Sequence, residues 1–312
     1  MTGSYSVVRR VLSSMSQPPA NRPVLVAVGD PAHAEQLVRT AGDLARLEDG
    51  VVRIVSITVK PQSSPFSLYT DETIIEEYPG NSRQILERAI EVAPDDVTVE
   101  SEVLVARSVV DGITTAVGES EARALVVGWR ERRGRTNAVL GTTVDQLVER
   151  VPCDLYVERI GHEADGVDSI LLPVAGGPHV GPAARVATAI AATNDATISV
   201  LSVAPVDRGS ESAREYVAEA ELALENAGDS TVRTESRIEE GSETTDVIVE
   251  RAHEHDVLVF GTTRQSALHR RLVGSIPRAV VRQTEQTVIL CRAGDAVEGP
   301  VLRQLRQFLM PS

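Results

Sequence analysis

Leu125-Val126-Val127-Gly128 recurs 133 residues later as Leu258-Val259-Phe260-Gly261. Each copy is a short apolar run that ends at a glycine, which is typical of a buried strand in a parallel sheet. An internal repeat of this length indicates one fold unit written twice. Other pairs support the same repeat: Val24–Val28 with Ile170–Val174, Gly141-Thr142 with Gly274-Ser275, and Asp154–Arg159 with Thr287–Arg292.

The spacing of apolar residues alternates between strand and helix periods along both halves. In the first half we predict strands at 23–28, 51–58, 97–105, 124–129 and 153–158, and helices at 32–47, 81–93, 109–121 and 141–151. In the second half we predict strands at 168–174, 196–203, 231–239, 256–261 and 286–291, and helices at 180–193, 210–227, 243–254 and 274–284. Such alternation predicts an α/β fold of two Rossmann-like domains, each a five-stranded parallel sheet with helices on both faces.

The repeat sets the domain boundaries at 23–159 and 168–292. The first half carries 13 extra residues, which we assign to a longer connection around Lys60–Gly80. Residues 1–22 are expected to form an extension with a short helix and a linker. Residues 293–312 form an amphipathic tail, for which docking on its own domain and binding to a partner both remain open.

Composition excludes several classes of protein. The 312 residues include 45 Asp and Glu against 31 Lys and Arg, a net charge of −14, which disfavours nucleic acid as a partner. Lys60 is the single lysine, and this acid-rich, lysine-poor usage fits a high-salt cytoplasm such as that of a halophilic archaeon. Residues 1–22 lack a signal-peptide core, and no apolar run is long enough to span a bilayer, so we expect a cytoplasmic location.

The stretch from Gly128 to Thr143 contains the candidate ligand site. A strand ends at Gly128, a polar, arginine-rich loop follows, and Gly141-Thr142-Thr143 opens a helix. The unpaired backbone N–H groups and the dipole of a helix start can bind a phosphate. Gly128 can equally make a turn and Thr142 a helix cap, so the residues alone leave both interpretations open.

Both halves resemble universal stress protein (UspA-type) domains, whose fold is adenine nucleotide alpha hydrolase-like. The resemblance rests on the short first strand, the Val-Val-Gly fourth strand, the Gly-(Ser/Thr) helix start, and Val151-Pro152-Cys153-Asp154 before the last strand. Gly128-Trp129 and the Pro173–His179 loop are similar to the tandem stress-protein module found as the cytosolic tail of archaeal amino-acid permeases.

The resemblance implies an ATP site at a Gly-x2-Gly-x9-Gly-(Ser/Thr) loop. Gly128, Gly141 and Thr142 match this pattern in domain 1, and Gly261, Gly274 and Ser275 match it in domain 2. The middle glycine is replaced by Glu131 and Arg264, and the family's Asp after the first strand by Gly29 and Ala175, although Asp30 follows Gly29. We therefore expect ATP or another anion at Gly128, Gly141, Thr142, Thr143 and Asp30, a weaker site in domain 2, and no metal.

The resemblance also implies an internal pseudo-dimer, in which the last strands of the two domains pair antiparallel. Cys153 and Cys291 could then approach each other across this junction, although buried thiols are expected in a reducing cytoplasm. A further pairing of two chains into a homodimer stays open. The sequence lacks a nucleophile elbow and a Walker loop, so we expect a regulatory protein and not an enzyme. The alternative function is a ligand-free interaction module that regulates a membrane transporter, such as an amino-acid permease, or another partner.

Overall fold

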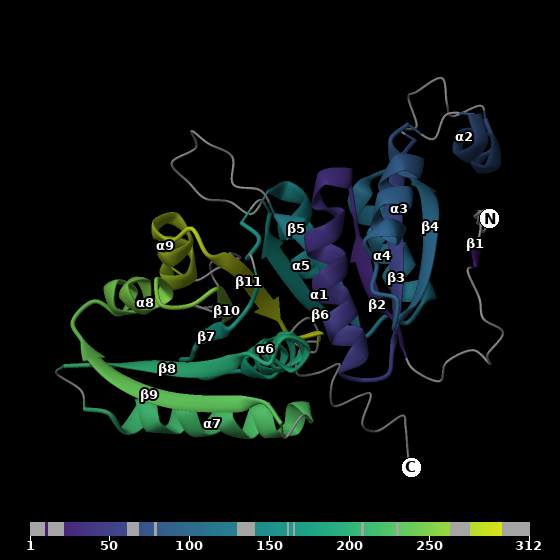
Figure 1. The fold of residues 1–312 in the computed structure, drawn as a ribbon. Coiled ribbons are helices and arrows are strands. Elements are labelled where there is room, and N and C mark those ends of the chain that lie inside the picture. The colour runs from purple at the N-terminus through teal and green to yellow at the C-terminus, as the bar shows by residue number, and fades with distance from the viewer. Residues whose placement is uncertain are drawn as a thin grey trace, which may run out of the picture.

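The computed structural model describes residues 10–11, 22–60, 69–77, 80–129, 141–160, 162–164, 166–206, 209–228, 231–262 and 275–294. Figure 1 shows two α/β units that share one sheet. The elements of domain 1 are β2 (Val24–Ala27), η1 (Pro31–His33), α1 (Ala34–Arg46), β3 (Val51–Val59), α2 (Asp71–Glu77), α3 (Ser82–Glu91), β4 (Thr98–Ala106), α4 (Val109–Glu119), β5 (Ala124–Trp129), α5 (Thr142–Arg150) and β6 (Asp154–Arg159).

Domain 2 repeats this order of strands and helices. Its elements are β7 (Ser169–Pro173), α6 (Val180–Asn194), β8 (Thr197–Pro205), α7 (Glu211–Ala227), β9 (Arg233–Gly241), α8 (Thr244–Ala252), β10 (Val257–Gly261), α9 (Ser275–Gln283) and β11 (Thr287–Arg292). Every strand and helix predicted for the two domains is present, with bounds that differ by a few residues. Hydrophobic periodicity is a strong guide here because most of the strands are buried and the helices have one apolar face.

Each domain contains the predicted five-stranded parallel sheet. The strand order is β4-β3-β2-β5-β6 in domain 1 and β9-β8-β7-β10-β11 in domain 2. The last strands, β6 and β11, pair antiparallel and join the two sheets into one. Val157 lies opposite Leu290, its own equivalent in the repeat, so the pseudo-two-fold axis passes through this pair. The predicted internal pseudo-dimer is therefore confirmed.

Two apolar cores lie on opposite faces of the sheet, and each extends through both domains. Helices α1, α3, α6 and α7 pack on one face, while α4, α5, α8 and α9 pack on the other. Cys291 belongs to the first core and Cys153 to the second. Both cysteines are buried free thiols, because the sheet separates their side chains despite the antiparallel junction. No helix in the described part of the chain is long and apolar enough to cross a membrane.

Two features of domain 1 differ from the sequence expectation. Arg10–Val11 forms a short strand, β1, which pairs antiparallel with β4, where we expected a helix. An open strand edge offers unpaired backbone groups that favour extended pairing over a helix. The extra residues of domain 1 include helix α2, whose Ile74 and Ile75 pack against Val103 and Val105 of β4. The remainder of residues 1–21 and residues 295–312, including the amphipathic tail, lie outside the described residues.

Candidate functional site

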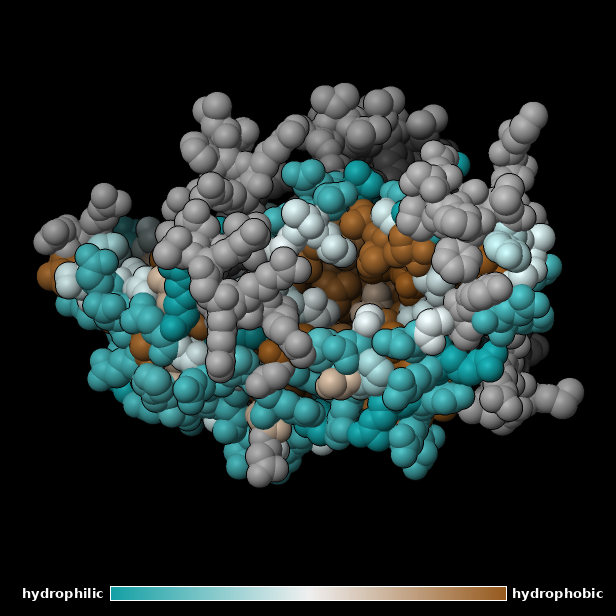
Figure 2. All heavy atoms as spheres, turned by 90° about the horizontal axis from the view of Figure 1, so that it is seen from above, coloured by the Kyte–Doolittle hydropathy of each residue, from teal (hydrophilic) through white to brown (hydrophobic). Residues whose placement is uncertain are grey.

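The carboxyl ends of β2 and β5 form the candidate site of domain 1. These two strands are parallel neighbours, with Ala27 opposite Val127. The chain leaves β2 for α1 on one face of the sheet and leaves β5 for α5 on the other. Such a reversal of strand order leaves a crevice, where open α/β sheets bind ligands. Figure 2 looks onto this edge from the top of Figure 1 and shows an apolar hollow with a polar rim.

Gly141 and Thr142 start helix α5 at this edge. Gly141 is the N-cap residue with φ of +96°, a conformation that strongly favours glycine, and it offers no side chain to cap the helix. Thr142 is exposed and Thr143 is half-buried. The first-turn N–H groups of α5 and the positive end of its dipole are therefore available to an anion. The geometry fits the phosphate-binding interpretation of Gly141, Thr142 and Thr143.

Gly128 and Gly261 have a packing role that the sequence did not reveal. A Cβ atom on Gly128 would lie 2.7 Å from Cγ1 of Ile160, and one on Gly261 would lie 2.9 Å from the carbonyl oxygen of His179. Both contacts are too short for any larger residue without a shift of the neighbour. Close packing thus requires glycine at the ends of β5 and β10, independently of any ligand.

Asp30 follows β2 at the same edge. Its Oδ1 accepts a hydrogen bond of 3.0 Å from the backbone N–H of Ala32, so the side chain caps the short helix η1. Its Oδ2 lies 3.8 Å from Nε2 of His33. The carboxylate is about half exposed, and its role toward a ligand stays a prediction. Gly274 and the loop with Glu131 lie outside the described residues, as does the side chain of Ser275.

Domain 2 has a cavity of about 160 Å³ at its own carboxyl edge. The lining residues are mostly apolar, including Leu172, Val203 and Phe260, and the described lining contains no Asp, Glu, Lys or Arg. Tyr216 of α7 also lines this cavity and packs beside Gly176. Without a charged side chain, these residues fit the triphosphate and ribose of ATP poorly. The order of preference between the two domains stays a prediction, because residues 263–274 of domain 2 lie outside the described residues.

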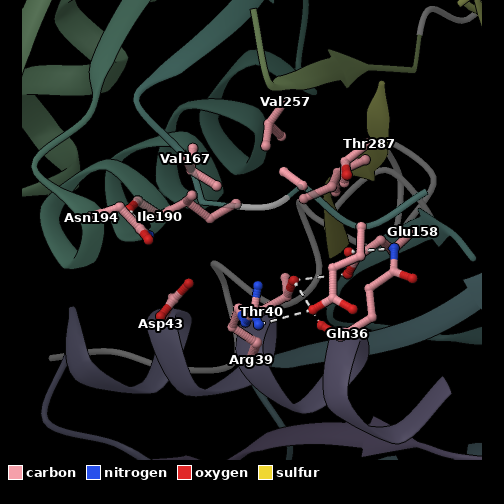
Figure 3. Close-up of a pocket in the computed structure, with 13 residues that line it drawn as sticks. Gln36, Arg39, Thr40, Asp43, Glu158, Val167, Ile190, Asn194, Val257 and Thr287 are labelled. Atoms are coloured by element: carbon pink, nitrogen blue, oxygen red, sulfur yellow. Dashed lines mark hydrogen bonds and ion pairs between the residues drawn. The ribbon is translucent and has the colours of Figure 1, made fainter. Parts of the chain in front are cut away.

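A polar cluster at the junction of the two domains was not predicted (Figure 3). Glu158, at the end of β6, is only 3% exposed. Its Oε1 accepts a hydrogen bond of 3.0 Å from Nε2 of Gln36, and its Oε2 accepts one of 2.8 Å from Oγ1 of Thr40. Burial raises the pKa of Glu158 to about 7. Burial also raises the pKa of Asp43, on the same helix as Gln36 and Thr40, to about 7.

The cluster surrounds a cleft of about 30 Å³, which has room for about one water molecule. Side chains of both domains line it, among them Asn194 of α6 and Thr287 of β11. Two carboxyl groups of raised pKa therefore lie where α1 of domain 1 meets domain 2. No group of three or more His, Cys, Asp or Glu is placed to hold a metal ion in the part of the chain that the structure describes.

A pair of buried arginines crosses the junction in both directions. Arg159 of domain 1 donates hydrogen bonds to the carbonyl oxygens of Val281 and Thr284 at 2.6 and 3.0 Å, and to that of Gln286. Arg292, its equivalent in the repeat, donates to the carbonyl oxygens of Val151 and Cys153 at 2.7 and 3.0 Å. Each arginine thus satisfies carbonyls at the carboxyl end of the last helix of the other domain.

The family model of the universal stress protein family matches residues 20–159 and again residues 166–292. The chain belongs to the universal stress protein family. The two matches coincide with the two halves of the sheet, so this is a tandem member of the family. The search of curated proteins gave no match.

Solved structures share the tandem fold of this universal stress protein. One is a universal stress protein from Archaeoglobus fulgidus, with a TM-score of 0.54 and 14% identity over 87% of this chain and 97% of that chain. A protein of unknown function from Pseudomonas aeruginosa has a TM-score of 0.55 and 18% identity over 93% and 98%. The cytoplasmic domain of a prokaryotic cation chloride cotransporter has a TM-score of 0.53 and 12% identity over 90% and 98%.

Proposed function

We propose that this universal stress protein is a regulatory, non-catalytic module that holds ATP or another anion at the carboxyl edge of domain 1. The observation that carries the proposal is the start of α5. Gly141 has a φ of +96°, no side chain caps the helix, and Thr142 is exposed beside the crevice between β2 and β5. These are the features of a helix N-terminus that receives a phosphate.

The resemblance to the family's ATP-binding loop supports the same residues. Gly128, Gly141 and Thr142 occupy three positions of that pattern. The module would hold the nucleotide and report its presence to a partner in stress response or in the regulation of transport. We place this activity in the cytoplasm. A site in domain 2 at Gly261, Gly274 and Ser275 is the weaker candidate, because the described cavity there offers no charged side chain.

The test is a titration of the full chain with ATP by calorimetry, comparing Gly141→Val with Gly228→Val. Gly228 has a φ of +97° at the end of α7, and a Cβ at either glycine would meet no atom within 4 Å. Both variants therefore place a β-branched residue at a positive φ, one at the proposed site and one away from it. We expect Gly141→Val to weaken binding at least tenfold and Gly228→Val to leave it unchanged.

Acid extraction of the purified protein and nucleotide analysis of the extract complement the titration. An adenine nucleotide that copurifies with the parent chain and is lost in Gly141→Val supports the proposal. A chain that carries no nucleotide and ignores added ATP and inorganic phosphate contradicts it. Equal loss of binding in both glycine variants would also contradict it, because general strain would then explain the effect.

The second candidate function is a ligand-free module that regulates a transporter or another partner. It is favoured by the likeness of the whole tandem fold to the cytoplasmic domain of a cation chloride cotransporter. The amphipathic tail is the segment we assign to partner binding. Removal of residues 296–312 should then abolish capture of the partner while the circular dichroism spectrum stays unchanged. Capture that survives this truncation would contradict the assignment of the tail.

A further inference from the structure

Strand β9 forms the outer edge of the sheet in domain 2 (Figure 1). Its counterpart in domain 1, β4, has its outer edge covered by β1 and one face covered by α2. No described strand covers the outer edge of β9, and its residues from Arg233 to Ile238 are all exposed. An open edge presents unpaired backbone N–H and C=O groups that can pair with another strand.

The charges of β9 alternate in sign along one face. Successive side chains of a strand point to opposite faces, so Arg233, Glu235, Arg237 and Glu239 share one face. Glu239 pairs with Arg251 of α8 at 2.8 Å. The two central charges, Glu235 and Arg237, are exposed and form no ion pair with another described residue. This face therefore carries the regular series plus, minus, plus, minus.

We propose that β9 pairs antiparallel with β9 of a second copy of this chain, around a two-fold axis at Ser236. In this register Glu235 lies opposite the partner's Arg237, and Arg233 lies opposite the partner's Glu239. The two-fold axis repeats both pairs, so all four charges of each strand face an opposite charge. Cross-strand pairs of opposite charge stabilise an antiparallel ladder.

The register is specified by the same charges. A shift that centres the pairing on Glu235 would place Glu235 against itself and Arg233 opposite the partner's Arg237. A shift to Arg237 would place Arg237 against itself and Glu235 opposite the partner's Glu239. Like charges directly opposite each other destabilise the ladder. A two-residue slip in either direction is therefore disfavoured, and a one-residue slip would place the charged face of one strand beside the other face of its partner.

Cross-linking at the axis tests the register. Ser236→Cys places two thiols opposite each other in the proposed dimer, whereas Thr234→Cys places each thiol opposite the partner's Ile238. The two native cysteines are buried, so they do not compete for a short bifunctional thiol reagent. We expect a covalent dimer with Ser236→Cys and none with Thr234→Cys. Absence of the dimer with Ser236→Cys, or equal yields with both variants, would overturn the proposal.

Charge exchange tests the interface in solution by sedimentation equilibrium at fixed ionic strength. Arg237→Glu alone and Glu235→Arg alone each create two like-charge pairs across the axis and should weaken dimerisation at least tenfold. The double variant Glu235→Arg with Arg237→Glu restores every pair and should dimerise as the parent does. A monomeric parent chain at 100 μM (roughly the upper range for a specific dimer) would overturn the proposal. So would single variants that dimerise like the parent, or a folded double variant that does not recover.

Discussion

Glu158→Gln tests whether the junction of the two domains holds a buried carboxyl group. The substitution keeps the shape of the side chain and removes its ability to ionise. Gln36 and Thr40 can still reach the replaced side chain, because a glutamine oxygen accepts hydrogen bonds and its amide donates them. The variant therefore isolates the cost of a buried negative charge from the cost of lost packing.

The magnitude follows from the pKa of Glu158. Its ordinary value is 4.5, and burial raises it to about 7 in the folded protein. Between these two values the folded state binds more protons than the unfolded state, so stability falls as the pH rises. One pKa unit corresponds to 1.36 kcal/mol. The parent chain should lose about 3 kcal/mol of its free energy of unfolding between pH 4.5 and pH 7 through this group, and the Glu158→Gln variant should not.

The assay is urea denaturation followed by circular dichroism, from pH 5 to pH 8.5 at constant salt. The variant should gain stability relative to the parent as the pH rises, with most of the gain complete by about pH 8. Glu250→Gln removes an exposed carboxylate of domain 2 and controls for the change in net charge. Parallel stability curves for Glu158→Gln and the parent would refute the reasoning. Such curves would mean that the carboxyl group is no harder to ionise in the folded state.

Two further predictions concern the same junction. Arg159→Met or Arg292→Met leaves buried carbonyls of the opposite domain without donors and should lower the free energy of unfolding by about 3 kcal/mol. The exposed Arg83→Met is the control and should change this free energy little. Calorimetry compares the three variants, and equal melting temperatures would contradict the role of the buried arginines. Burial raises the pKa of Cys153 to about 12 and raises that of Cys291 well above its ordinary value. Neither thiol should therefore react with an aromatic disulfide reagent at pH 8 until the chain is unfolded. Rapid reaction in the native state would contradict this prediction, because it would show that the thiols are accessible.

The spacing of apolar residues predicted the strands and helices, because this pattern depends only on residues that are neighbours in the sequence. The strand Leu125–Gly128 is apolar throughout since helices cover both its faces, and no distant contact is needed to recognise it. Arg159 and Arg292 recur at the same place in the repeat, which signals a shared role. The role itself depends on carbonyls of the opposite domain, and these are more than 120 residues away for Arg159.

At the candidate site, sequence reasoning found the residue whose role depends on its own backbone and missed those whose role depends on distant contacts. Gly141 precedes α5 with a φ of +96°, a backbone conformation that favours glycine. Gly128 fits the same sequence pattern but is required by contact with Ile160, which no local pattern reveals. Glu158 lies near the end of a strand, where a charged side chain is usually exposed to solvent, yet α1 and domain 2 together bury it. Sequence patterns therefore located the helix start correctly and missed the buried charges of the junction.

Duplication within one chain lets the two halves diverge, which a symmetric dimer of identical domains cannot do. Domain 1 combines the helix start at Gly141 with a covered strand edge. Domain 2 combines a cavity without charged side chains among its described lining residues with a β9 edge that no described strand covers. If both proposals hold, ligand binding and chain pairing occur in different domains. Any effect of the ligand on pairing must then cross the junction of the two domains, where β6 pairs with β11 and α1 packs against α6. Because Glu158 and the two arginines are buried there, Glu158→Gln becomes informative about coupling as well as stability.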